Sequence, residues 1–348
     1  MIRIALLLCL ACVAGATSAQ ATGPDLVAER MLQVQTASGG WPKHLAGRDV
    51  VYTLAFDAEA EAALAKPGRV DDATIDNDAT TREIVHLATA WQRTGHRPYR
   101  DAAVRGVDYL LGAQYANGGW PQFHPDTSGY RSQVTFNDDA MTQVVALLQD
   151  IAQGQGALAA LTPLRGQAAS DAVARAIALI LDLQVRIDGT PTIWAAQYDA
   201  RTLVPAMARS YELASLATAE SASIVRLLMR QPQPSSRIVA AIEAACAWFA
   251  AHGLADTAVQ RIGHDGGRPR DVRLVAEPGA VSWARFYDLE RQQPLLADRG
   301  GRVVASLAEL TIERRTGYAW YGTWPHPLLT QALPQWRQQL HGREAGSP

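Results

Sequence analysis

The segment Gln35–Pro42 reads Gln-Thr-Ala-Ser-Gly-Gly-Trp-Pro, and 79 residues later Gln114–Pro121 repeats its frame as Gln-Tyr-Ala-Asn-Gly-Gly-Trp-Pro. In each copy the glutamine ends an apolar helical pattern, the glycine pair allows a left-handed helix end, and the tryptophan can pack back on the helix. A degenerate third copy occurs at Trp320–Pro325. We infer helix pairs that repeat along the chain. The alternative is that both copies are merely similar helix-ending turns.

Helical periodicity dominates the rest of the chain. Apolar residues recur at helical spacing after Pro98, after Asp139, and in the runs that contain Val173 and Ile238. The alternation typical of a strand appears only in short pieces such as Val272–Val275. The pattern predicts an all-α fold, an (α/α) toroid or barrel of antiparallel helix pairs with short irregular β pieces and with its loops gathered at one rim.

The first residues have the composition of a cleavable secretory signal. An apolar run from Ile4 to Val13 follows Arg3, and small residues then permit cleavage after Ala19 or Ala21. The run is too short to span a bilayer, and no other segment resembles a membrane helix. We expect residues 1–21 to be a signal peptide, residues 22–348 to form a single domain, and the protein to be secreted or periplasmic. A buried N-terminal helix is the alternative.

Composition narrows the classes of partner. The chain has 32 basic and 34 acidic residues and a formal net charge of −2, which argues against nucleic acid as the main partner. We also expect no membrane partner and a monomer. Removal of the signal peptide leaves Cys246 as the last cysteine, so an internal disulfide is impossible. The apolar helical pattern around Cys246 predicts a buried, inert thiol.

Two acidic clusters each stand directly before an amphipathic helical run. They are Thr74–Asp78, which reads Thr-Ile-Asp-Asn-Asp, and Phe136–Asp139, which reads Phe-Asn-Asp-Asp. Oxygen ligands without His or Cys are what a Ca²⁺ or Mg²⁺ site needs, and two structural repeats would place both clusters at the same rim. The alternative for each cluster is an ordinary helix N-cap, and Thr80 with Glu83 fits a capping box.

Three basic residues are candidates for binding an anionic substrate beside such a metal. Arg209 lies in Ala-Arg-Ser-Tyr, and Arg285 lies in Ala-Arg-Phe-Tyr. Lys43 follows the first Trp-Pro pair and can reach a more distant carboxylate. The alternatives are ordinary ion pairs for the arginines and a solvated lysine.

Six stretches, taken in order, resemble the pectate lyases of polysaccharide lyase family 10. They are Ala73–Asn77, Tyr109–Phe123, Phe136–Asp138, Tyr211–Leu213, Trp283–Tyr287 and Glu313–Gly322. The resemblance runs from about residue 25 to 328, and an ordered match of this length is more specific than any single motif. It implies a helical toroid that cleaves polygalacturonate (pectate) by β-elimination with Ca²⁺ and releases 4,5-unsaturated oligogalacturonides.

The resemblance also implies roles for single residues. By motif, Asp76, Asn77 and Asp138 take the calcium-associated positions, Arg209 takes that of the arginine base, and Arg285 takes that of a substrate-binding arginine. Ca²⁺ on the substrate carboxylate would stabilise the enolate that develops on loss of the C5 proton. A free guanidinium stays protonated, so Ca²⁺ and Arg285 would have to lower the pKa of Arg209.

The sequence departs from the family's pattern at five positions. Asp78 stands where glycine is expected, Asp139 where an uncharged residue is common, and Tyr198 where histidine is expected, while Met207 and Val304 replace common lysines. Extra acid near the metal would tighten Ca²⁺ binding or repel the substrate, and the lost lysines would weaken the grip on a polyanion. Catalytic rate, oligomer length, methyl-ester preference and endo or exo action stay open.

Two other functions fit the same residues. A glycoside hydrolase on a helical toroid would use Asp76 or Asp138 as acid and base. A uronate-binding protein that has lost turnover through the five substitutions would bind polygalacturonate and release no product.

Overall fold

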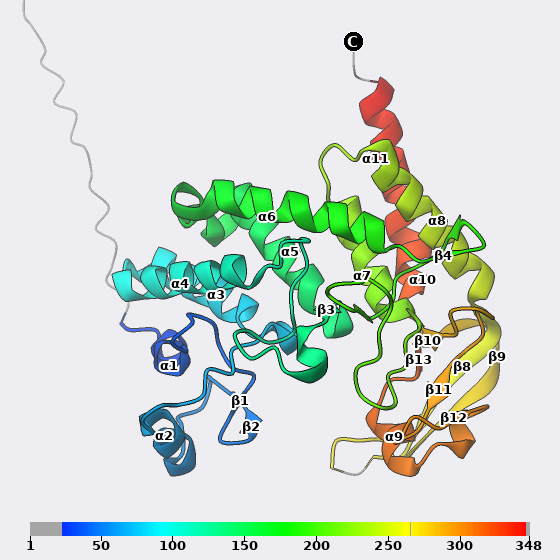
Figure 1. Ribbon diagram of the computed structural model, residues 1–348, viewed down its shortest axis with the longest axis horizontal. Helices are drawn as coiled ribbons and strands as arrows, with labels where there is room; N and C mark the ends of the chain where they lie inside the picture. Colours follow the sequence, from blue (N-terminus) through cyan, green and yellow to red (C-terminus); the bar gives the residue numbers. More distant parts are fainter. Residues whose placement is uncertain (1–22, 265, 346–348) are drawn as a thin grey trace, which may run out of the picture.

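The computed structural model describes residues 23–264 and 266–345, so the predicted signal peptide lies outside the described residues. The main helices pack in two layers (Figure 1). One layer consists of α1 (Leu26–Val34), α3 (Thr81–Thr94), α5 (Ala140–Ala152) and α7 (Thr218–Met229). The other consists of α4 (Arg97–Ala113), α6 (Thr162–Leu183) and α8 (Ser236–His252). Each helix of the second layer follows and contacts a helix of the first, so the fold is the predicted all-α toroid of antiparallel helix pairs.

Further elements of the described residues lie outside the two layers. The remaining helices are α2 (Ala58–Ala65), α9 (Ile312–Gly317), α10 (Pro325–Pro327) and α11 (Leu333–Ala345). Two-residue strands pair antiparallel as β1 (His44–Leu45) with β2 (Arg48–Asp49), β3 (Val134–Thr135) with β6 (Gln197–Tyr198), β4 (Arg186–Ile187) with β5 (Thr190–Pro191), β7 (Leu216–Ala217) with β10 (Phe286–Tyr287), and β11 (Leu296–Ala297) with β12 (Val303–Val304).

One β element is much longer than the short pieces expected. Strands β8 (Leu254–Ile262) and β9 (Asp271–Ala284) form an antiparallel hairpin, and β13 (Tyr321–Gly322) pairs with β9. Most side chains of the hairpin are exposed or half-buried on both faces. Its sequence therefore lacks the apolar alternation that marks a strand with one buried face, and only Val272–Val275 showed it.

Glutamine side chains tie the repeats together. Gln35, Gln114 and Gln184 directly follow α1, α4 and α6. Each Nε2 donates to a carbonyl in its own turn and to a carbonyl of a neighbouring helix. The acceptors are Gly39 (2.8 Å) and Ala102 (2.9 Å) for Gln35, Gly118 (3.0 Å) and Ala172 (2.9 Å) for Gln114, and Thr192 (2.9 Å) and Ala241 (3.0 Å) for Gln184. These bonds fix each turn relative to the next helix pair.

Tryptophan indoles form the second recurring contact of the repeat and show where its third copy lies. Their Nε1 atoms donate to carbonyls near the ends of α1, α4, α6 and α8. The pairs are Trp41 with Met31 (2.8 Å), Trp120 with Leu110 (2.7 Å), Trp194 with Ile180 (2.7 Å) and Trp283 with Phe249 (2.9 Å). The third copy is therefore at Trp194, whereas Trp320 bonds to Arg314 in α9 (3.0 Å). Trp194 escaped notice because Thr192 and Ile193 replace the glycine pair.

The apolar helix faces pack into a continuous core. Cys246 belongs to it with 2% of its surface exposed, and burial raises the pKa of its thiol to about 12. The predicted buried thiol is confirmed. No helix in the described ranges has both the length and the apolar character required to cross a membrane.

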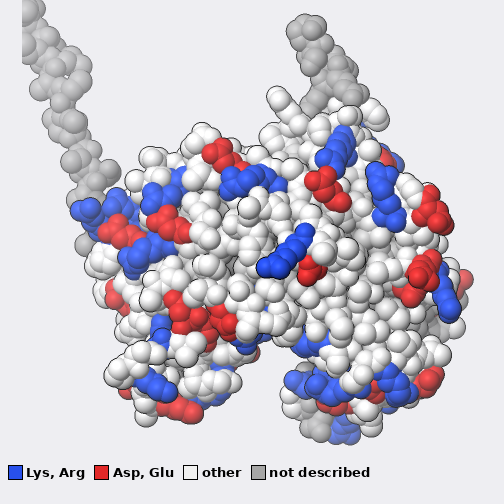
Figure 2. Space-filling model, in the orientation of Figure 1, with Lys and Arg blue, Asp and Glu red and all other residues white. Residues whose placement is uncertain are grey.

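Two lobes project from one side of the helix layers (Figure 1). One carries α2, β1 and β2, and the other carries α9, the β8–β9 hairpin, β11 and β12. The space-filling view shows the surface hollowed between them (Figure 2). The lobes therefore flank an opening at one edge of the toroid.

We predict that Gln114→Ala lowers the free energy of unfolding by about 1–3 kcal/mol, because the carbonyls of Gly118 and Ala172 lose their shared donor. Urea unfolding followed by circular dichroism measures the change. The matched control is Gln167→Ala on α6, because the exposed Gln167 side chain bonds, among the described residues, only to Asp171 one turn away. Equal stability of the two variants would contradict the role of the glutamine.

Candidate active site

The two acidic clusters fold into turns with the same backbone. Turn η1 spans Asp76–Asp78, turn η3 spans Asn137–Asp139, and the two turns contact each other. Asn77 has φ +49° and Asp138 has φ +50°, a left-handed conformation that Asn and Asp adopt more readily than most residues. The repeats thus place Asn77 and Asp138 at equivalent positions of two neighbouring turns.

Neither cluster serves as a conventional cap for the helix that follows. The N-cap residues of α3 and α5 are Thr80 and Asp139, and neither side chain accepts a capping hydrogen bond. The Thr80 hydroxyl instead accepts from the Trp41 amide at 3.0 Å, and Glu83 accepts from Arg82 at 2.7 Å. The predicted capping box is therefore wrong, and the capping alternative does not explain the carboxylates.

A cleft of about 300 Å³ joins residues from distant parts of the chain. Its lining includes Lys43 from the loop before β1, Asp76 from η1, Asp138 from η3 and Arg209 from the segment before α7. Four of the six predicted site residues thus share one cleft. Asn77 is exposed within η1 and does not line the cleft.

Asp76 is a buried carboxylate with one hydrogen-bonded oxygen. Lys43 Nζ donates to Asp76 Oδ2 at 2.7 Å. Asp76 Oδ1 is buried and has no hydrogen-bond partner among the described residues. Such an oxygen is costly to bury unless something binds it. Lys43 was predicted to contact the substrate. Its ammonium group instead pairs with Asp76, the carboxylate that the metal site would use.

Asp138 is bound on both oxygens. Asn137 Nδ2 donates to Asp138 Oδ2 at 2.8 Å, and Arg285 Nη2 donates to Asp138 Oδ1 at 3.0 Å. The side chain is about one-third exposed. It therefore presents an oriented carboxylate to the cleft beside a guanidinium that compensates its charge.

Arg209 is clamped by a buried glutamate. Its Nε donates to Glu212 Oε2 at 2.7 Å and its Nη2 to Glu212 Oε1 at 2.5 Å. The Tyr318 hydroxyl donates to the same Oε1 at 2.9 Å. Burial lowers the pKa of the Arg209 guanidinium, but the hydrogen bonds and charge of Glu212 outweigh it and raise the pKa above its ordinary value. The Nη1 group of Arg209 keeps no partner among the residues described here.

Arg285 is buried next to the cleft rather than in its lining. Besides Asp138, it bonds to Glu220, which is fully buried in the first turn of α7. Its guanidinium also lies 5.0 Å from the ring centre of Tyr318. Burial opposes the charge of Arg285, yet Glu220 and its neighbours hold the pKa well above the ordinary value. Arg285 is therefore a fixed cation that orients Asp138.

Sequence reasoning missed three residues of this site. Glu212, Glu220 and Tyr318 hold the two arginines, and two of them stand inside stretches that carried the family resemblance. Glu220 gave no clear signal in the sequence, because it stands beside Ser221 in the first turn of a helix, where an exposed acid is ordinary. A buried acid in a helix calls for a cationic partner, and the partner here is Arg285, 65 residues away.

The donors of this cleft fit a hard cation such as Ca²⁺. Within the lining, Asp76 Oδ1 is available and Asp138 lies in the adjoining turn, whereas the exposed amide of Asn77 lies outside the lining. The described residues contain no group of three or more His, Cys, Asp or Glu side chains arranged to hold a metal. Because Ca²⁺ takes six to eight oxygens, substrate and water would have to supply the rest.

The five departures from the family pattern lie mostly away from this cleft. Asp78 pairs with Arg82 at 3.1 Å, and Asp139 lines a neighbouring pocket. Tyr198 is buried and donates to the Leu183 carbonyl at 2.8 Å, Met207 is exposed, and Val304 is buried in β12. The two extra acids are therefore not additional ligands in the cleft.

We predict that Arg285→Leu lowers the free energy of unfolding by about 3–5 kcal/mol, because it leaves Glu220 buried without its cation. Adding Glu220→Leu to this variant recovers part of the loss, which urea unfolding of both single variants and the double variant measures. Arg273→Leu, in the exposed hairpin, is the control. A double variant no more stable than Arg285→Leu would show that charge compensation is not the role of the pair.

Known proteins share both the sequence pattern and the fold. The model of the family described as pectic acid lyase matches residues 35–329. A family 10 polysaccharide lyase from Cellvibrio cellulosa is 30% identical, with a TM-score of 0.78 over 88% of this chain and 91% of that one. A mutant of that lyase in complex with trigalacturonic acid gives the same identity and TM-score, with 92% of its chain covered. No curated protein sequence matches. On the extent of the family match, this chain belongs to the pectic acid lyase family.

Proposed function

We propose that the protein is a pectate lyase that cleaves polygalacturonate by Ca²⁺-dependent β-elimination and releases 4,5-unsaturated oligogalacturonides. The observation that carries the proposal is one cleft lined by Lys43, Asp76, Asp138 and Arg209 in a chain of this family. A relative with the same fold forms a complex with trigalacturonic acid, which supports a uronate substrate. The signal peptide expected in residues 1–21 suits a polymer that cells meet outside their cytoplasm.

In the proposed reaction a base removes the proton on C5 of a galacturonate unit. The electron pair of that C–H bond forms the C4–C5 double bond, the C4–O4 bond breaks, and O4 leaves with the neighbouring sugar and takes a proton from water. Bound Ca²⁺ would neutralise the substrate carboxylate and acidify C5. Asp76, Asn77 and Asp138 would hold the cation.

Arg209 is the proposed base, acting through Nη1. Glu212 occupies Nε and Nη2 and fixes the plane of the guanidinium, so the remaining nitrogen can face the cleft. The same pairing raises the pKa of Arg209, which opposes deprotonation. The neutral guanidine is thus a minor species, and we expect turnover to increase toward alkaline pH as that species becomes more populated.

We predict that polygalacturonate incubated with the protein yields an ultraviolet-absorbing unsaturated product in the presence of Ca²⁺, and that a chelator abolishes it. Absorbance and reducing ends are followed together. Reducing ends without absorbance would indicate hydrolysis, and binding without either product would indicate a non-catalytic uronate-binding protein. Full activity of metal-free protein in excess chelator would refute the calcium requirement.

Calcium titration of the free protein by calorimetry separates metal binding from turnover. Asp76→Asn should weaken Ca²⁺ binding at least about tenfold, because it removes the charge of the carboxylate whose Oδ1 has no partner among the described residues. Asp171→Asn, on the exposed face of α6, is the control. Equal Ca²⁺ affinities in both variants would remove Asp76 from the site.

We predict that Arg209→Ala lowers kcat at least about a hundredfold and retains most of the affinity for oligogalacturonate. Arg209→Lys should recover little, because an ammonium cannot reproduce the planar contact with Glu212. Added guanidine should restore turnover to Arg209→Ala in a saturable manner, and not to Arg209→Ala combined with Glu212→Gln. Arg201→Ala is the exposed control. Near-normal kcat in Arg209→Ala would exclude this residue as the base.

A further inference from the structure

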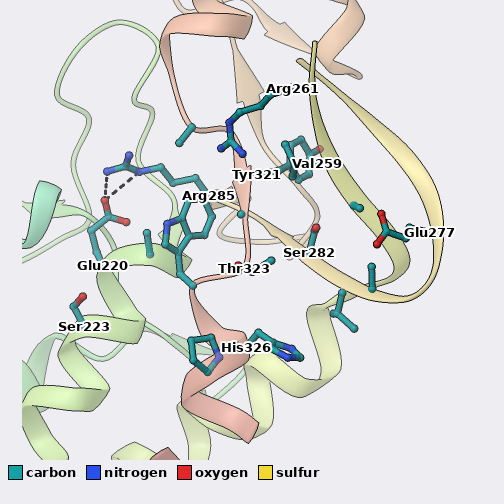
Figure 3. Close-up of a pocket in the computed structure, with 18 of the residues that line it drawn as sticks. Glu220, Ser223, Val259, Arg261, Glu277, Ser282, Arg285, Tyr321, Thr323 and His326 are labelled. Atoms are coloured by element: carbon teal, nitrogen blue, oxygen red, sulfur yellow. Dashed lines mark hydrogen bonds and ion pairs between the residues drawn. The ribbon is translucent and has the colours of Figure 1, made fainter. Parts of the chain in front are cut away.

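A second and larger pocket adjoins the cleft (Figure 3). Its volume is about 930 Å³, within the range of small-ligand sites. Its walls come from α7, from the β8–β9 hairpin and from the segment between β13 and α10. Asp138 lines both this pocket and the cleft, and Arg285 lines the pocket. An extended ligand that passes Asp138 in the cleft can therefore continue into the pocket.

Two further arginines of this pocket, Arg226 and Arg261, form no ion pair with a carboxylate of the described residues, although Arg226 is close enough to Asp139 to interact with its charge. Arg226 on α7 donates through Nη2 to the Trp324 carbonyl at 3.1 Å, which holds it at the pocket wall. Arg261 on β8 has no hydrogen bond or ion pair in the described part of the chain, and Figure 3 shows its side chain directed inward from the hairpin. Since guanidinium groups bind carboxylates through paired hydrogen bonds, these two side chains can donate to carboxylates of a ligand.

The acids of the pocket limit which anions it can take. Asp138 and Glu220 are both bonded to Arg285. Asp139 and Glu277 remain to face a ligand, against the two arginines. A dense anion such as a phosphate cluster would be repelled by this mixture. A ligand with carboxylates spaced along a neutral, hydroxyl-rich chain can match it.

Aromatic and hydroxyl side chains complete the pocket. Tyr321 is buried in the wall with 7% of its surface exposed and offers little of its ring, whereas Trp324, which also lines the pocket, is half-buried and can present more of its ring. Thr323 is exposed between them. Flat rings suit the apolar faces of pyranose sugars, and hydroxyl groups can exchange hydrogen bonds with sugar hydroxyls. The pocket therefore has the chemistry of an acidic-sugar site.

We propose that this pocket binds further galacturonate units of the chain being cleaved, with Arg226 and Arg261 as their carboxylate contacts. The proposal rests on the proposed function, because it extends the same substrate beyond the reacting units. The pocket would make the protein prefer long oligomers, and it would add affinity without contacting the reacting atoms.

The test compares trigalacturonate with hexagalacturonate in the Arg226→Ala/Arg261→Ala variant. We expect calorimetric affinity and kcat/KM for the hexamer to fall about tenfold or more, while those for the trimer change by less than about twofold. Arg273→Ala is the matched control, because Arg273 is exposed on the same hairpin, bonds to Gln260 and lies outside the pocket. The affinity for a methyl-esterified hexamer should be the same in the wild-type protein and in the double variant.

Three results would overturn the proposal. Unchanged affinity and kcat/KM for the hexamer in the double variant would show that the pocket does not bind the chain. Equal losses for trimer and hexamer would place the arginines at the reacting units or in the fold. The same loss for the esterified hexamer would exclude carboxylate contacts. If the wild-type protein forms no unsaturated product, the proposed function fails, whereas the calorimetric dependence on chain length still tests the pocket.

Discussion

The contact between turns η1 and η3 is the constraint on which the site depends. Each turn holds two consecutive non-glycine residues with positive φ, which costs conformational energy that the surrounding structure must offset. The Trp41 and Trp120 indoles are anchored on helix ends, and their backbone carbonyls accept from the amides of Thr74 (3.0 Å) and Thr135 (3.2 Å), directly before the two turns. Because these anchors repeat, the two turns arrive at one place with Asp76 and Asp138 close to one cleft. The contacts that stabilise the repeat are thus also the contacts that position the site.

Charge compensation is the second organising feature. Glu212 and Glu220 are buried acids that hold Arg209 and Arg285, and Tyr318 contacts both arrangements through its hydroxyl and its ring. Removing one member of such a pair leaves the other charged in a medium of low dielectric constant. Loss of activity after substitution of Arg285 would therefore not by itself identify a substrate contact, because the fold would also be less stable, and stability measurements are needed to separate the two effects.

The β8–β9 hairpin is the part of the fold through which the proposed preference for long oligomers would arise. It stands in the repeat at the place where the fourth tryptophan, Trp283, follows α8, so it is an insertion into the turn of a helix pair. Its exposed faces add little to the core. Its position beside α7 instead encloses the larger pocket. An insertion of this kind can change which chains are bound while the turns that hold the acids stay in place.

The sequence by itself determined the class of fold and most of the candidate residues. Helical periodicity and the two glycine–tryptophan turns are local patterns, and local patterns survive in sequence because helix ends and turns need particular residue types. The acidic clusters and the buried Cys246 were found from local patterns too, whereas the roles assigned to Arg209 and Arg285 came from the family resemblance. Only the tertiary structure decided what those side chains contact. The pairing of Lys43 with Asp76 and of Arg285 with Glu220 depends on how separate parts of the chain pack. The pairing of Arg209 with Glu212, three residues apart, depends on the conformation of one loop. The third copy of the repeat at Trp194 and the exposed hairpin were hidden as well, since neither leaves the glycine pair or the apolar alternation that a sequence shows.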